Sequence, residues 1–140
     1  MTTALDTNVV IALWDRSPVL NGAAKRALDT ALERGPLVAA APVFAELMAA
    51  PGRDVVFLDE FVRSTNIRVD WDLNERVWRA AGRAFQAYAS RRQRARELRP
   101  RRILVDFVIG AHAAVNGFRL LTFDSGIYEA AFPALAIERV

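Results

Sequence analysis

Short apolar runs alternate along the chain with longer segments in which apolar residues recur every three or four positions. The short runs are typical of buried β-strands, and the periodic segments are typical of helices. Strands that alternate with helices indicate a mostly parallel sheet covered by helices on both faces. We therefore expect a three-layer α/β/α fold with four or five strands, predicted at Thr3–Leu5, Leu37–Ala41, Ile67–Val69, Arg119–Thr122 and, at an edge, Ala136–Glu138.

Proline and glycine residues mark the ends of several predicted helices. Pro18 can open a helix that Gly35 ends, and Pro42 can open the next one, because proline fits a first helical turn. The segment Asp72–Glu75 fits a capping box for a long fifth helix, which we expect to break at Pro100. Further helices are predicted at Asn8–Asp15, at Asp54–Arg63, at Ile103–Asn116 with Gly117 as its stop, and after Asp124.

The composition excludes several kinds of site. The 140 residues suit a single domain, and more than half of them are hydrophobic. The absence of cysteine excludes disulfides, iron–sulfur clusters and thiolate zinc sites, and one histidine, His112, excludes a histidine-rich metal site. His112 lies on a different helix face from Asp106, so we expect it to pack or hydrogen-bond. No window is apolar enough to span a membrane and no signal peptide is visible, so we expect a cytoplasmic protein.

Acidic residues stand where the predicted strands end. Asp6 follows the first strand and Asp124 the fourth, and Glu46 lies about one turn into the helix after the second strand. In an open α/β sheet, ligands bind beyond the carboxyl ends of the strands. Asp106 begins a helix at the same edge. We therefore expect one site formed by four acids, Asp6, Glu46, Asp106 and Asp124.

A cluster of carboxylates requires a compensating charge. Asp106 interrupts the apolar sequence Ile103–Ala111, where an unpaired charge is costly. A helix N-terminus offsets only roughly 0.3–1 kcal/mol for one charge. Carboxylates forced together raise one another's pKa or recruit a cation, and oxygen ligands favour Mg²⁺ or Mn²⁺. An aspartate at a helix start is more often a cap than a ligand, so the prediction rests on the edge that the four acids share and on the apolar context of Asp106.

The motifs around these acids resemble those of PIN-domain nucleases, and specifically the VapC-type toxins of bacterial type II toxin–antitoxin pairs. The resemblance covers essentially the whole chain. It rests on the order and spacing of four short motifs, Leu5–Asn8, Val43–Leu47, Asp106–Ala113 and Leu121–Asp124.

The resemblance implies a PIN-like fold and a metal-dependent endoribonuclease, in which Mg²⁺ or Mn²⁺ activates water against RNA phosphodiester bonds. It implies that the four acids are catalytic and that Asp6, Asp106 and Asp124 bind the metal. It also implies products with 5′-phosphate and 3′-hydroxyl ends, a homodimer and a cognate antitoxin protein. The residues that would position the acids or the water are Thr7, Asn8 and Thr122.

Positive charge is concentrated in one arginine stretch, Arg91–Arg102. It contains seven arginines and one acid, Glu97, whereas the rest of the chain has a net negative charge. Clustered arginines favour phosphate contacts, so the stretch is the best candidate for RNA binding. A solvated helix end and a docking surface for an acidic protein segment remain open as alternatives. The candidate residues are Arg91, Arg92, Arg94, Arg96, Arg99, Arg101 and Arg102.

Two other functions fit parts of the sequence. One is a degenerate PIN-like module that binds RNA or protein without catalysis, and the complete set of four acids argues against it. The other is a phosphotransfer domain. A haloacid-dehalogenase-like phosphatase needs a second acid two positions after the first, where this chain has Asn8. A receiver domain needs a lysine late in the chain, and the only lysine is Lys25.

Overall fold

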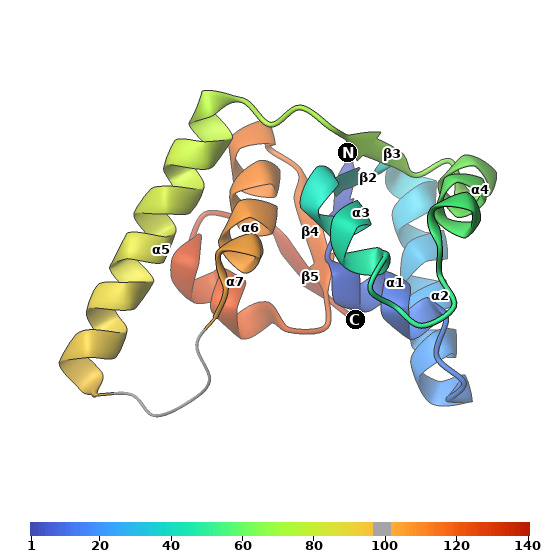
Figure 1. Ribbon diagram of the computed structural model, residues 1–140, viewed down its shortest axis with the longest axis horizontal. Coiled ribbons are helices and arrows are strands. Elements are labelled where there is room, and N and C mark those ends of the chain that lie inside the picture. The colour runs from blue at the N-terminus through green and yellow to red at the C-terminus, as the bar shows by residue number, and fades with distance from the viewer. Residues whose placement is uncertain (97–101) are drawn as a thin grey trace.

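A five-stranded parallel sheet organises the part of the chain that the structure describes, residues 1–96 and 102–140 of a computed structural model. The strand order is β3-β2-β1-β4-β5, which places β1 at the centre (Figure 1). This confirms the predicted α/β fold. The strands are β1 (Thr3–Leu5), β2 (Leu37–Ala40), β3 (Arg68–Asp70), β4 (Arg119–Thr122) and β5 (Ile137–Arg139).

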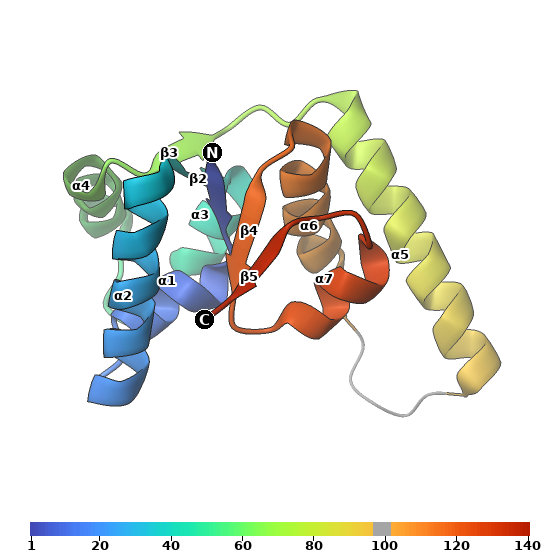
Figure 2. The ribbon, with the colours of Figure 1, turned by 180° about the vertical axis from the view of Figure 1, so that it is seen from behind.

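Helices cover both faces of this sheet. Figure 1 shows α3 and α6 in front of the strands, with α5 outside α6. Figure 2, seen from behind, shows α2 on the opposite side. Within the described ranges the helices are α1 (Thr7–Leu13), α2 (Pro18–Arg34), α3 (Ala41–Leu47), α4 (Val55–Thr65), α5 (Glu75–Ala95), α6 (Leu104–Asn116) and α7 (Ser125–Ala131).

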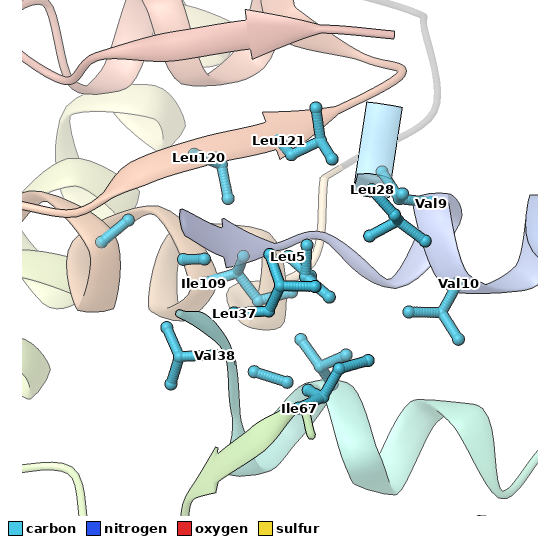
Figure 3. Close-up of a cluster of buried hydrophobic side chains, with 14 of the residues drawn as sticks. Leu5, Val9, Val10, Leu28, Leu37, Val38, Ile67, Ile109, Leu120 and Leu121 are labelled. Atoms are coloured by element: carbon cyan, nitrogen blue, oxygen red, sulfur yellow. The ribbon is translucent and has the colours of Figure 1, made fainter. Parts of the chain in front are cut away.

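The main core lies between the central strands and the helices on both faces (Figure 3). Leu5 of β1 pairs in register with Leu121 of β4, and both side chains are fully buried. Leu28 of α2 and Ile109 of α6 belong to the same cluster. The apolar runs of β1, β2 and β4 are therefore buried on both faces, as the parallel sheet requires.

Helix α6 explains why one segment is apolar on nearly every side. Ile109 faces the main core, whereas Phe107 joins a second cluster with Val77 and Ala81 of α5. The helix thus lies between the sheet and α5, which explains its apolar pattern, although its first residue, Leu104, is exposed. In the described ranges no helix is long and apolar enough to cross a membrane.

The predicted N-terminal cap of α5 is wrong. The Asn74 side chain accepts the hydrogen bond from Val77 N at 3.1 Å, so Asn74 and not Asp72 caps the helix. The helix ends at Ala95, where Arg96 adopts a left-handed backbone conformation. The predicted break at Pro100 lies outside the described residues.

The two outermost strands are short and carry charges. On β3, Arg68 Nε and Asp70 Oδ1 are 3.0 Å apart. On β5, Glu138 pairs with Arg34 and Arg119. Both strands are shifted by one residue from their predicted bounds, because half-exposed strands show a weaker apolar pattern than buried ones.

At Gly110, α6 packs closely against Tyr128 of α7 and against Phe132, the residue that follows α7. A Cβ atom at Gly110 would lie 2.4 Å from Cε2 of Phe132 and 3.0 Å from Cδ1 of Tyr128. We expect Gly110→Ala to lower the free energy of unfolding by about 1–3 kcal/mol, because overpacking displaces neighbouring groups. Urea denaturation measures this change.

Gly82→Ala is the matched control for that substitution. Gly82 lies within α5 and has no atom within 4 Å of an added Cβ. Alanine there should leave stability unchanged or raise it by up to about 1 kcal/mol, because it favours the helix more than glycine does. Equal losses in both variants would contradict the packing explanation.

Candidate active site

The four predicted acids line one pocket at the carboxyl edge of the sheet. Asp6 directly follows the central strand β1, and Asp124 follows its neighbour β4. Glu46 reaches the pocket from α3, and Asp106 from the first turn of α6. The pocket has a volume of about 220 Å³ and is also lined by Thr7, Asn8, Ile11, Arg102, Ile127 and Tyr128.

The two aspartates do not cap the helices that they precede. Asp6 and Asp124 occupy the N-cap positions of α1 and α7, yet neither side chain makes the capping hydrogen bond. An aspartate in that position would ordinarily accept a bond from an N–H group of the first helical turn. Both residues instead line the pocket, so helix capping does not account for them.

The carboxylate of Asp6 is nearly buried and is held by three side chains. Thr122 Oγ1 donates to Asp6 Oδ2 at 2.7 Å, Tyr128 Oη at 3.0 Å and Asn8 Nδ2 at 3.2 Å. Burial raises the pKa of Asp6 above its ordinary value, the charge of Asp124 adds to this rise, and the bonds from Thr122 and Tyr128 partly offset it. The network fixes the orientation of a carboxylate that protonates more readily than an exposed one.

The three polar residues predicted to support the acids each contact one of them. Thr7 Oγ1 donates to Glu46 Oε1 at 2.6 Å. Besides their bonds to Asp6, Asn8 accepts a bond from Phe123 N, and Thr122 Oγ1 accepts one from Asp124 N at 3.0 Å. The segment after β4 is thereby held against the segment after β1.

Asp106 is affected by the other acids of the pocket. Burial raises the pKa of Asp106, and the negative charges of Asp6 and Glu46 raise it further. The nearby Arg102 guanidinium partly offsets this rise. Asp6, Glu46 and Asp106 are therefore close enough to repel one another, as expected of a site that attracts a cation.

Arg102 is the basic residue among the described residues that line the pocket. Its Nη2 lies 2.7 Å from Asp124 Oδ2, and its backbone N donates to the Tyr88 hydroxyl at 2.8 Å. Burial tends to lower the pKa of Arg102, but the ion pair with Asp124 outweighs this effect and raises it. Arg102 thus remains charged and neutralises part of the acidic pocket.

The residues present suit a divalent cation, although no closed set of ligands is preformed. In residues 1–96 and 102–140, no group of three or more His, Cys, Asp or Glu side chains is arranged to hold a metal ion. Thr7 engages Glu46, and Arg102 engages Asp124. Mg²⁺ often binds through only one or two carboxylates, together with water and substrate phosphate. The all-oxygen donors of this pocket fit that mode of binding.

His112 lies away from the pocket, in the core. Its side chain is 2% exposed, and its Nε2 lies 2.8 Å from Asp70 Oδ2 at the end of β3. Burial alone would raise the pKa of Asp70, but the hydrogen bonds from His112 and Arg68 lower it below its ordinary value. His112 therefore joins α6 to the edge strand, in agreement with the predicted packing role.

The arginine stretch divides between the end of α5 and the pocket. Arg91, Arg94 and Arg96 are exposed at the end of α5, and Arg92 is partly buried there. Arg102 reaches the pocket itself. Arg99 and Arg101 lie outside the described residues.

Two site residues were missed as such in the sequence. Tyr128 carried no prediction from the sequence, yet its hydroxyl donates to Asp6 Oδ2. The spacing of Asp124 and Tyr128, four residues apart, could have placed both on one side of α7. Arg102 was predicted only as one of the seven arginines of the stretch, and nothing in the sequence pattern indicated its ion pair with Asp124.

Comparisons with known proteins agree with this fold. The family model described as "PIN domain" matches residues 3–133. No curated protein matches the sequence closely enough to count as a relative.

Solved structures of similar fold include three complexes. A chain of FitAcB from Neisseria gonorrhoeae is 21% identical with a TM-score of 0.65, and the match covers 96% of this chain and 95% of that one. A chain of VapBC-1 from nontypeable Haemophilus influenzae is 19% identical with a TM-score of 0.65, over 99% and 98%. A chain of VapBC2 from Rickettsia felis, bound to a DNA fragment from its promoter, is 16% identical with a TM-score of 0.65, over 99% and 98%.

The raised pKa of Asp106 predicts a specific pH dependence of stability in chelator. A carboxyl whose folded-state pKa is raised stabilises the fold below its unfolded pKa, and this contribution is lost as the pH rises through the folded value. Asp106→Asn removes the ionisable group, so the variant does not lose stability in this way as the pH rises. The variant should gain stability relative to the wild type as the pH rises above about 4, the ordinary pKa of an unfolded aspartate. Urea denaturation at several pH values measures the difference.

Asp59→Asn, on the exposed side of α4, controls for the loss of one negative charge. It should not reproduce the pH trend. If Asp106→Asn were less stable than the wild type at every pH, Asp106 would be a structural residue of the α6 N-terminus and not a repelled acid.

Proposed function

Since the chain belongs to the PIN-domain family, we propose that it is a divalent-metal-dependent endoribonuclease, the VapC-type toxin of a toxin–antitoxin pair. PIN domains are generally nucleases. The observation that carries the proposal is the convergence of four acids from four different elements on one pocket. The raised pKa values of Asp6 and Asp106 show that their charged forms are unfavourable in the folded protein. A binding module without catalysis would have no need of such acids, because strongly perturbed acids are typical of functional sites.

The proposed ligands of Mg²⁺ or Mn²⁺ are Asp6 and Asp106, with Asp124 as a third. A divalent cation bound there supplies a Lewis acid for the scissile phosphate and for the attacking water. The raised pKa of Asp6 and of Asp106 makes either carboxylate a better proton acceptor for that water than an ordinary aspartate. Thr7 and Thr122 hold Glu46 and Asp6 in fixed orientations.

The proposed substrate is RNA, bound in part through the arginine stretch. An acidic pocket repels the phosphates that it must cleave, and arginines beside it offset this repulsion. In this proposal the exposed arginines at the end of α5 and Arg102 at the pocket contact phosphates of the RNA backbone. Contacts of this kind bind the backbone and not the bases, so they support affinity without selecting a sequence.

The proposed protein partners are a cognate antitoxin and a second copy of the chain. The similar structures named FitAcB and VapBC are complexes. Ile11 is exposed where it lines the pocket, and Val56 and Phe57 are exposed on α4. Trp78 is exposed on α5. Exposed apolar surface of this kind favours protein contacts.

The metal-dependent reaction can be tested with purified protein and labelled RNA. The wild type should cleave RNA with Mg²⁺ or Mn²⁺, lose activity in chelator and recover it when metal is restored. Asp6→Asn should lower the cleavage rate by roughly 100-fold or more, because it removes a metal ligand and a proton acceptor. Gel electrophoresis of the products measures both effects.

Asp29→Asn is the control, since Asp29 is an exposed acid of α2 paired with Lys25. It should cleave at the wild-type rate. Undiminished cleavage in chelator, or by Asp6→Asn, would contradict the proposal. Tight RNA binding by the wild type without any cleavage would favour the degenerate binding module.

The RNA path can be tested by replacing Arg94 and Arg96 with Ala in the inactive Asp6→Asn protein. Both side chains are exposed at the end of α5. RNA affinity should fall, and the slope of log affinity against log salt should flatten by about 0.7 for each lost phosphate contact. Fluorescence anisotropy at several salt concentrations measures the slope.

Replacement of Arg79 and Arg83 by Ala removes the same charge from the first half of α5 and serves as the control. The control should change affinity less. If the slope does not change in the Arg94 and Arg96 variant, the stretch contacts solvent or a protein partner, and the RNA lies elsewhere.

A further inference from the structure

A basic side chain occupies the acidic pocket. Among the described residues that line this pocket, Arg102 is the only base, and its Nη2 lies 2.7 Å from Asp124 Oδ2. Its positive charge also acts on Asp106, where it partly offsets the rise in pKa that burial and the neighbouring acids cause. The guanidinium therefore offsets acid repulsion where a metal ion would otherwise do so.

The position of Arg102 is fixed by the fold. Its backbone N donates to the Tyr88 hydroxyl of α5, and α6, which carries Asp106, begins two residues later. The side chains of Arg102 and Asp124 are 41% and 45% exposed. An ion pair with that exposure is anchored at one end but can be separated at modest cost.

The guanidinium and a metal ion are both attracted to the negative charge of Asp124. A metal ion that binds Asp124 weakens the ion pair of Asp124 with Arg102, and it also meets the positive charge of Arg102 at the pocket. We propose that Arg102 is an internal counter-ion that competes with the divalent cation for Asp124, so that metal binding exchanges the guanidinium out of the pocket. This inference rests on the metal site in the proposed function.

The exchange has a consequence for the substrate. The displaced guanidinium stays at the pocket, because its backbone is anchored to Tyr88. Its planar set of donors suits a phosphate, which carries the charge that Asp124 no longer offers. When the metal site fills, Arg102 thus exchanges its ion pair with Asp124 for a contact with a substrate phosphate. Metal binding is thereby coupled to binding of the nucleic-acid backbone.

The test is the affinity of the full-length protein for Mn²⁺ alone, measured by isothermal titration calorimetry without RNA. Arg102→Gln should bind Mn²⁺ about 3- to 10-fold more tightly than the wild type, because the competing ion pair and the repelling charge are both lost. Arg79→Gln is the matched control, since it removes one charge and the surface ion pair with Glu75 outside the pocket. Its affinity should equal that of the wild type.

Measurements in the Asp124→Asn protein distinguish the loss of the Arg102–Asp124 ion pair from simple charge repulsion between Arg102 and the metal ion. In Asp124→Asn protein, the further change Arg102→Gln should tighten Mn²⁺ binding by less than about twofold, because no ion pair remains to be broken. Arg102→Lys, which keeps the charge without the planar fork, should lie between the wild type and Arg102→Gln. Circular dichroism melting in chelator verifies that each variant is folded, and Arg102→Lys replaces Arg102→Gln if the latter is not.

The possible outcomes are distinct. Equal Mn²⁺ affinity of the wild type and Arg102→Gln overturns the inference and leaves the proposed metal site intact. An equal gain with and without Asp124 also overturns it, since repulsion alone then accounts for the effect. If Mn²⁺ binds none of these proteins, the proposed function fails together with the inference.

Discussion

The burial of the Asp6 carboxylate at the end of the central strand is the constraint on which the site depends. A carboxylate in this position is tolerated only when donors or an opposite charge compensate it. Thr122 from β4 and Tyr128 from α7 supply two of the donors. These bonds exist only if β1, β4 and α7 are correctly placed, so the packing of the fold and the shape of the pocket are determined together.

The sequence predicted the fold and the location of the site because both follow from short-range patterns. Strands β1, β2 and β4 are buried on both faces, so their apolar runs are unambiguous. The convergence of Asp6 and Asp124 needed only the rule that parallel strands share a carboxyl edge. Glu46 and Asp106 followed because α3 and α6 begin at that edge.

The contacts within the site could not be predicted in the same way. The ion pair of Arg102 with Asp124 and the bond of Tyr88 to Arg102 join different elements, and they depend on side-chain geometry that no pattern encodes. The cap of α5 shows the same limit, since Asp72 and Asn74 are both good capping residues and only the backbone geometry selects Asn74. The Asp70 partner of His112 was missed for the same reason.

The charged outer strands determine how copies of this chain can associate. In the described sheet, β3 and β5 are the outermost strands, each three residues long and each bearing one acid and one arginine. Extending a sheet across such an edge would bring these charges against those of a neighbour and strip them of water, which is how many proteins avoid aggregation through strand addition. Self-association is thereby directed to the helical surfaces, where exposed apolar side chains such as Trp78 lie. The charges at the sheet edges thus limit which surfaces of this chain can meet in an assembly, independently of the chemistry in the pocket.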